Sequence, residues 1–145
     1  MKQEPIVFKP DLTPKQMFEL GVFGGDYFAE DIAEYPKSWT AHAKLSDHGY
    51  DATLNCFGVR ASQPLAEWQR KGWIHPADPR GWFQWYCRYT MGRRMPEEDE
   101  RQIRRWYNVR RHIAQLQKHC APGDQHCRPV QRQALLHWAY DSRAL

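Results

Sequence analysis

The stretch Gly81-Trp-Phe-Gln-Trp-Tyr-Cys-Arg-Tyr-Thr-Met-Gly-Arg-Arg94 places five aromatic rings and three arginines within fourteen residues. Four of the rings keep the i, i+3, i+4, i+7 spacing of one helix face: Trp82, Trp85, Tyr86 and Tyr89. The pattern predicts a helix that opens at Asp78-Pro79 and runs to Met91, where Gly92 stops it. Rings at this spacing are typical of a protein core, so we expect most of them to be buried.

The overall composition agrees with an aromatic core. Seven Trp, seven Tyr and six Phe must fill much of the interior of this 145-residue chain, because Val and Ile are few. A chain of this length forms one domain without the help of disulfides or metal. We therefore expect a single domain over residues 1–145, and the mean hydropathy of -0.85 does not by itself indicate disorder.

Caps, prolines and glycines predict further helices on both sides of the aromatic helix. The expected helices are at 14–20, a weaker one at 36–43, 62–72, a long one at 96–120 and a last one from Pro129. Residues 45–61 have no helical period and are expected to be irregular. The predicted fold class is mainly α: a single compact domain of about five or six helices with long irregular connections.

The long helix at 96–120 has two predicted faces. One is an apolar stripe that should face the core: Ile103, Trp106, Val109, Ile113, Leu116 and Cys120. The other is polar and mostly basic: Arg101, Arg104, Asn108, Arg111, Gln115 and Lys118. On the last helix, the residues expected to face inward are Val130, Ala134, Leu135 and Trp138.

Positive charge is concentrated in the second half of the chain. Residues 1–50 hold five Lys and eight acids, a balance of -3, whereas residues 88–132 hold ten Arg, one Lys and five acids, a balance of +6. A local basic field favours partners that carry phosphate groups. The simpler alternative is that the acids at 97–100 and in the first third of the chain pair with these arginines.

The arginines and the aromatic helix together predict a binding surface. Arginine offers a planar fork of donors that matches phosphate oxygens, and aromatic rings stack on bases. We therefore predict binding of nucleic acid or of a phosphorylated planar ligand such as a nucleotide, with Trp82 stacking on it. The full predicted set is Trp82, Gln84, Arg88, Arg93, Arg94, Arg104 and Arg111. Gln84 and Arg88 lie on the narrow polar stripe of the aromatic helix. Their side chains are either exposed to water or hydrogen-bonded to partners inside the protein.

Two other functions fit the sequence. One is a small enzyme whose pocket opens among residues 23–28, residues 45–60 and the start of the aromatic helix. In it, Asp26 or His48 would transfer a proton and Arg88 would bind an anion. An Asp that follows two glycines also has a simpler role, which is to cap the turn. The other alternative is a protein-interaction module. The sequence lacks the signature motifs of hydrolases, NTPases and dehydrogenases.

The cysteines raise the question of disulfides and metal. The N-terminus lacks the apolar core of a signal peptide, and no stretch is apolar enough to span a membrane. We therefore expect a cytoplasmic protein without membrane contact, with its four cysteines reduced and Cys87 inert in the core. Cys120, His126 and Cys127 form a weaker candidate for a zinc site, because six residues separate the cysteines where a zinc knuckle has two. We predict no cofactor.

Several longer motifs extend over the chain: Phe23–Phe28, Asp78–Tyr89, Gly92–Arg94, Asp99–Ile103 and Cys127–Tyr140. In these segments the chain resembles a family of small uncharacterised proteins from bacteria, fungi and large DNA viruses. The central motif is Gly-Trp-Phe-Gln-Trp-Tyr-Cys-Arg-Tyr followed by Gly-Arg-Arg, and the resemblance covers most of the chain. It implies a single domain. The resemblance implies no activity, cofactor or catalytic residue for this chain, because none is known for that family.

Overall fold

The computed structural model describes residues 6–25, 32–46, 50–59, 70–72 and 74–145. Within these ranges the fold is helical, as predicted, and no strand occurs. The α-helices are α1 (Pro14–Leu20), α2 (Lys37–Thr40), α4 (Trp82–Thr90), α5 (Pro96–Asn108), α6 (Arg111–His119) and α7 (Pro129–His137). Short 3₁₀ turns add Ile32–Glu34, Ala52–Leu54 and Ser142–Ala144. None of these described helices is long and apolar enough to cross a membrane.

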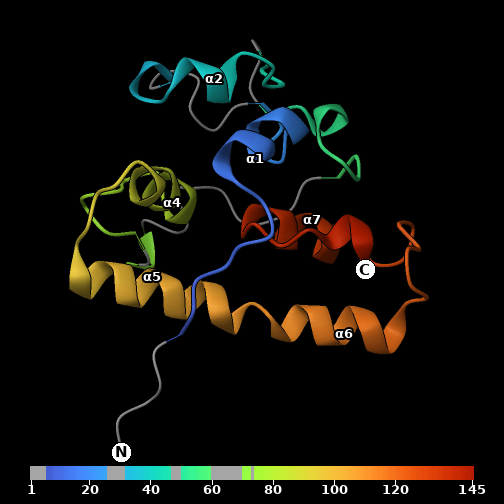
Figure 1. The fold of residues 1–145 in the computed structure, drawn as a ribbon. Coiled ribbons are helices and arrows are strands. Elements are labelled where there is room, and N and C mark those ends of the chain that lie inside the picture. Colours follow the sequence, from blue (N-terminus) through green and yellow to red (C-terminus); the bar gives the residue numbers. More distant parts are fainter. Residues whose placement is uncertain (1–5, 26–31, 47–49, 60–69, 73) are drawn as a thin grey trace, which may run out of the picture.

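The helices are stacked in tiers (Figure 1). Helices α1 and α2 lie at the top of the view, α4 and α7 lie below them, and α5 and α6 follow one another end to end at the bottom. Contacts join α1 to α4, α4 to α5, and α6 to α7. The row formed by α5 and α6 therefore has one side against the other helices and one side facing outward.

Helix α1 forms where the sequence predicts it. The Thr13 side chain accepts a hydrogen bond from the Gln16 N–H at 3.2 Å, and the Gln16 side chain accepts one from the Thr13 N–H at 2.9 Å. Gly21 ends the helix with a positive φ of 63°. This capping box and the left-handed glycine satisfy the helix ends locally, so even a short helix is stable here.

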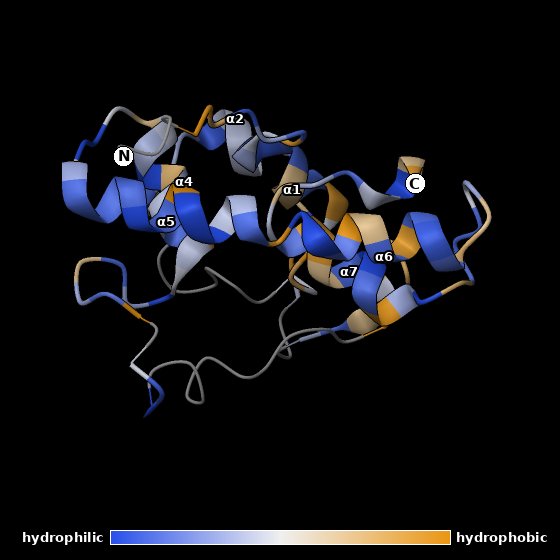
Figure 2. Cartoon of the chain, turned by 90° about the horizontal axis from the view of Figure 1, so that it is seen from below, coloured by the Kyte–Doolittle hydropathy of each residue, from blue (hydrophilic) through white to orange (hydrophobic). Residues whose placement is uncertain are grey.

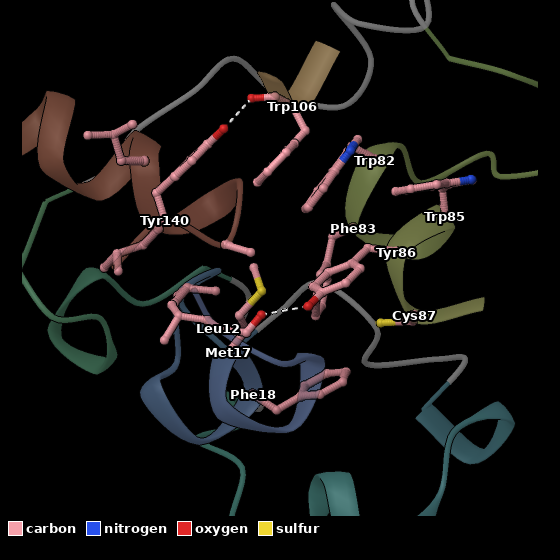
Figure 3. Packing of buried hydrophobic residues seen from close by; sticks show 14 of the residues in the cluster. Leu12, Met17, Phe18, Trp82, Phe83, Trp85, Tyr86, Cys87, Trp106 and Tyr140 are labelled. Carbon is pink, nitrogen blue, oxygen red and sulfur yellow. Dashed lines mark hydrogen bonds between the residues drawn. The ribbon is translucent and has the colours of Figure 1, made fainter. Parts of the chain in front are cut away.

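An aromatic core fills the space between the tiers. Phe8, in the N-terminal segment, lies among the rings of α4 and α5, with its centroid 5.5 Å from that of Tyr86 and 4.9 Å from that of Trp106. The Tyr86 hydroxyl donates to the Leu12 carbonyl oxygen, and the Tyr140 hydroxyl donates to the Trp106 carbonyl oxygen, each at 2.6 Å (Figure 3). The predicted aromatic core is confirmed, and these buried hydroxyls bind the backbone.

Helix α4 begins at Trp82, later than the Asp78-Pro79 start that the sequence predicts. Gly81 has a φ of 101°, which an α-helix cannot contain. Asp78 is fully buried in front of the helix, where arginines bind its carboxylate. The predicted start was wrong because Asp78 is an ion-pair partner and not a helix cap. The predicted end is close to the observed one, since Met91 is the C-terminal cap.

The single long helix predicted at 96–120 is two helices, α5 and α6. Between them, Val109 and Arg110 make a tighter turn, in which the Arg110 N–H donates to the Tyr107 carbonyl oxygen at 3.2 Å. The break follows Tyr107-Asn108-Val109, three successive residues of low helix propensity. The two helices stay nearly in line (Figure 1), so they keep a common outer side.

Helix α7 starts as predicted, but its inward face differs. Val130, expected inside, is 53% exposed, whereas Arg132 and Gln133 are completely buried. Arg132 Nε donates to the Cys127 carbonyl oxygen at 2.8 Å, and Gln133 Nε2 donates to the Val22 carbonyl oxygen at 2.7 Å. Hydrophobic spacing fails here because these polar side chains bind buried backbone carbonyls.

Two of the cysteines predicted to be reduced form a disulfide. Cys120 and Cys127 are bonded, with their Cα atoms 5.8 Å apart. A turn in which the Asp124 N–H donates to the Ala121 carbonyl oxygen at 3.1 Å brings them together. The prediction was wrong because it was based on the expected compartment and not on the geometry of this turn. The other two cysteines are free thiols.

The connections before α4 are irregular over most of their described length, as predicted. The weaker helix expected at 36–43 is the short α2, and residues 50–59 contain the 3₁₀ turn Ala52–Leu54. Of the helix predicted at 62–72, residues 62–69 lie outside the described part of the chain.

Candidate nucleic-acid interface

Two predicted ligand-binding residues on α4, Trp82 and Gln84, are buried. Trp82 Nε1 donates to the Gln102 carbonyl oxygen at 3.2 Å, and its ring centroid lies 5.0 Å from that of Trp138. Gln84 Oε1 accepts a hydrogen bond from the Arg80 N–H at 2.9 Å. Both predictions were wrong, because neighbouring elements cover the first turn of α4. Trp82 belongs to the core and cannot stack on a ligand.

Arg88 and Arg93, also predicted to bind phosphate, belong to an internal ion-pair network. Arg88 Nη2 and Nε bind the two carboxylate oxygens of Glu34 at 2.7 and 3.0 Å, and its Nη1 binds Asp78 Oδ1 at 3.1 Å. Arg93 binds both oxygens of Asp78, at 2.9 and 2.7 Å. The Asp78 carboxylate is 0% exposed, so these arginines neutralise a buried charge. We therefore correct their role: their donors hold the turn at 32–34 and the loop before α4 against the helix.

Electrostatics reinforce this network. The hydrogen bonds from Arg88 hold the pKa of the Glu34 carboxyl below its ordinary value. In turn, the bond to Glu34 raises the pKa of Arg88. Each partner stabilises the charged form of the other, which makes the pair a fixed structural contact.

Arg94 is exposed but folds back onto α4. Its Nη1 donates to the Tyr89 carbonyl oxygen at 2.8 Å, and its guanidinium carbon lies 3.7 Å from the centroid of the Tyr89 ring. It also precedes the acidic first turn of α5 at residues 97–99. A phosphate bound at Arg94 would therefore approach carboxylates, so we leave this predicted contact out of the interface.

Exposed basic residues gather instead on the outward side of α5 and α6. Residues 101–123 contain no acid, and they hold five Arg and one Lys. Seen from below, the ribbon of α5 is coloured mostly as hydrophilic residues (Figure 2). Two of the arginines bind acids of the first turns of α5: Arg101 binds Glu98 at 2.6 Å, and Arg104 binds Glu100 at 3.3 Å. The ion pair between Arg104 and Glu100 is exposed to solvent, and salt weakens exposed ion pairs.

The remaining cations of this side have no such partner. Arg110, Arg111 and Lys118 are exposed and form no ion pair with any residue that the structure describes. We call Arg104, Arg110, Arg111 and Lys118 the basic face. Of the seven predicted ligand-binding residues, Arg104 and Arg111 lie together on it.

Two residues of this surface were not predicted from the sequence, Arg110 and the aromatic Tyr107. The Tyr107 side chain is 43% exposed, and the guanidinium carbon of Arg110 lies 4.8 Å from its ring centroid. A signal was present in the sequence: Tyr107 falls outside the apolar stripe, three residues after Arg104 and four before Arg111. An aromatic residue on a polar helix face is the exception that could have identified it.

The inner side of α5 and α6 supports the basic face. The guanidinium carbon of Arg105 lies 5.3 Å from the centroid of the Trp138 ring, and burial lowers the pKa of Arg105 to about 10. Gln131 Nε2 lies 2.9 Å from His112 Nδ1 and donates to Gln115 Oε1 at 2.7 Å. These contacts tie both helices to α7, so the basic face rests on packed elements.

For the enzymatic alternative, the described part of the expected pocket is formed by two adjacent loops. The Ser46 N–H donates to the Gly25 carbonyl oxygen at 3.0 Å, and the Asp51 N–H donates to that of Gly24 at 2.9 Å. The hollow that described residues form beside them, lined by Met17, Phe18, Val22, Phe23, Lys44 and Leu45 among others, holds about 20 Å³ for water-sized molecules. That is room for a water molecule, whereas small-molecule sites span about 300–1,000 Å³.

The residues proposed for proton transfer, Asp26 and His48, lie outside the described part of the chain. Arg88, the proposed anion contact of that pocket, is bound to Glu34 and Asp78. The described residues therefore do not assemble a catalytic group in this hollow.

The predicted zinc site at Cys120, His126 and Cys127 is replaced by the disulfide, which takes both sulfur ligands. In the described residues, no three His, Cys, Asp or Glu side chains are placed to hold a metal ion. Cys87 is buried, and burial raises the pKa of its thiol well above the ordinary value. A buried neutral thiol fits the packing role predicted for Cys87.

No protein-family model, curated protein or solved structure matches the chain. The resemblance of its motifs to a family therefore stays a prediction, and its function must be argued from its own residues. The surface that emerges from them is the basic face with Tyr107 in its middle.

Proposed function

We propose that the chain binds nucleic acid through the phosphate backbone, on the basic face of α5 and α6. The observation that carries this proposal is the acid-free run at 101–123, in which Arg110, Arg111 and Lys118 stay exposed without ion pairs among the described residues. Guanidinium groups bind phosphate oxygens through parallel hydrogen bonds. Cations whose donors are not already used inside the protein remain free to do so.

The spacing of the charges suits an elongated polyanion. Arg111 and Lys118 are seven residues apart on α6, which is two helical turns, or about 10.5 Å, and Arg104 lies seven residues before Arg111 on α5. Because α5 and α6 are nearly in line (Figure 1), the charges form a row and not a cluster. A row of charges favours an extended strand of phosphates over a single small anion.

Binding to a packed surface also limits the entropic cost of association. Helix α6 is fixed to α7 by Gln131, and α5 is held to the Trp138 ring by Arg105. The backbone of the basic face therefore needs no ordering when a strand binds, and the cost is confined to a few long side chains.

The proposal predicts that neutralising the basic face weakens binding. We expect Arg111→Gln with Lys118→Gln to lower the affinity for a labelled oligonucleotide by about tenfold or more at low salt, because two phosphate contacts are lost. Fluorescence anisotropy measures this change. The matched control is Lys15→Gln with Lys37→Gln, which removes the same charge from α1 and α2.

Two outcomes would contradict the proposal. One is that the unaltered protein does not bind the oligonucleotide at low salt. The other is an equal loss of affinity in both double variants, which would mean that net charge matters and the basic face does not.

A further inference from the structure

Tyr107 breaks the polar pattern of the basic face. It is 43% exposed, whereas its neighbour Trp106 on α5 is buried, as are Trp82 and Trp85 on α4. Tyr107 lies three residues after Arg104 and four before Arg111, a spacing from which we infer that the ring has a cation on either side along the basic face. An exposed ring flanked by phosphate-binding groups is the arrangement that stacks a base.

Arg110 holds this ring in position. Its guanidinium carbon lies 4.8 Å from the ring centroid, within the range of a cation–π contact. Within the described residues, no other ring or cation contacts Tyr107. The ring is thus supported by one arginine while much of it remains open to solvent.

We propose that Tyr107 stacks on an unpaired base, and that the nucleic acid bound to the basic face is single-stranded; this inference rests on the function proposed above. The phosphates on either side of the stacked base would bind Arg104 and Arg111. Every base has a π-face, so such binding tolerates any sequence. Tyr107 thereby takes the stacking role that the sequence analysis gave to the buried Trp82.

A duplex fits this surface less well. Its bases are covered above and below by their neighbours, so an aromatic side chain on a helix surface finds no face to stack on. A duplex also carries a second backbone. Glu100 and Glu97 are exposed one and two turns before Arg104, and their charges would repel a backbone at that end. A single strand that runs from Arg104 toward Lys118 avoids Glu97, and its phosphate at Arg104 competes with the exposed Glu100, which binds Arg104 at 3.3 Å.

The test compares three probes of equal length: a mixed-sequence DNA strand, the same strand in a duplex, and a strand of abasic sugar-phosphate units. We expect Tyr107→Leu to weaken binding of the base-bearing strand by about 5- to 100-fold, which is the usual effect of losing one stacked base. Binding of the duplex and the abasic strand should not change. Tyr107→Phe is the matched control, because it keeps the ring and should keep the affinity.

Each outcome separates this inference from the proposed function. Three results would overturn the stacking role and leave phosphate binding intact. They are unchanged binding of the base-bearing strand to Tyr107→Leu, an equal loss of affinity for the abasic strand, and tighter binding of the duplex than of the single strand. Failure of all three probes to bind the unaltered protein at low salt would overturn both. Because Tyr107 is exposed, the fold of Tyr107→Leu should be intact, and circular dichroism checks this.

Discussion

At Gly24 the backbone passes so close to the Tyr50 ring that a side chain has no room. A Cβ at Gly24 would lie 2.7 Å from Tyr50 Cδ2, and the φ of Gly24 is +65°. The ring cannot easily move, since its hydroxyl accepts a hydrogen bond from Asn55 Nδ2 at 2.8 Å and donates to the Val59 carbonyl oxygen at 3.2 Å. Gly58 has the same φ but nothing within 4 Å of its Cβ position.

Replacing each of these two glycines by alanine should destabilise the protein by different amounts, because only Gly24 lies against a ring. Gly58→Ala should lower the free energy of unfolding by about 1–2 kcal/mol, which is the cost of a left-handed backbone for a residue with a side chain. Gly24→Ala should add about 1–3 kcal/mol to that cost, because Tyr50 must shift. Urea unfolding of both variants measures the difference, and equal losses would refute the close contact with Tyr50.

For single residues, sequence patterns predicted the contacts between neighbours in the chain and missed those between residues far apart in the sequence. The cap at Thr13 could be predicted because its partner is three residues away. The role of Arg88 could not, because Glu34 lies 54 residues earlier in the chain and such a pair leaves no periodic signal. Trp82 was misassigned for the same reason, since the elements that bury it come from distant parts of the sequence.

Among the elements, the connection between α6 and α7 is fixed at several points. The disulfide closes residues 120–127. Inside this loop, the Gly123 N–H donates to the Leu145 carbonyl oxygen at 2.9 Å. At its end, Arg132 Nε donates to the Cys127 carbonyl oxygen at 2.8 Å. The disulfide therefore anchors a loop that also contacts the last described residues.

Reduction of this disulfide should destabilise the protein. Freeing a loop of this length lowers the free energy of unfolding by about 2–3 kcal/mol in the chain-entropy model. The reduction requires a dithiol such as dithiothreitol, which is oxidised while the two cysteines become thiols. Thermal unfolding with and without the dithiol measures the effect. The double variant Cys120→Ser with Cys127→Ser should unfold at the temperature of the reduced protein, and the dithiol should not change that temperature. If the dithiol does not change the unfolding temperature of the unaltered protein either, the disulfide is absent or does not stabilise the fold.

Helix boundaries could be predicted where a local cap determines them. The start of α7 at Pro129 and the end of α1 at Gly21 match the sequence signals. The break at Val109 and Arg110 was missed because hydrophobic spacing continues across it. The late start of α4 was missed because Asp78 resembles a cap in sequence and is an ion-pair partner in the fold.

At the scale of the whole molecule, the N-terminal segment joins the middle and lower tiers. Phe8 lies among the rings of α4 and α5, and the N–H groups of Asp11 and Leu12 both donate to the Ala139 carbonyl oxygen, at 2.9 and 3.1 Å. The mainly α class and the aromatic core could be predicted from composition and spacing. The arrangement of the tiers could not, because contacts such as that between Tyr86 and Leu12 span 74 residues.

The arginines of this molecule serve two purposes that sequence alone does not separate. Arg88, Arg93 and Arg132 satisfy buried carboxylates or backbone carbonyls. Arg110 and Arg111 stay on the surface without ion pairs among the described residues. We propose that this second group, with Arg104 and Lys118, binds a chain of phosphates.

Phosphate binding on the basic face can be measured through the salt dependence of oligonucleotide affinity. If the four cations of the basic face each contact one phosphate of a single strand, log affinity should fall linearly with log salt concentration, with a slope of about -2.8. In Arg111→Gln with Lys118→Gln the slope should shrink to about -1.4, since the contacts of Arg104 and Arg110 remain. The same slope in both proteins, or an affinity that does not respond to salt, would show that the basic face does not bind the phosphates.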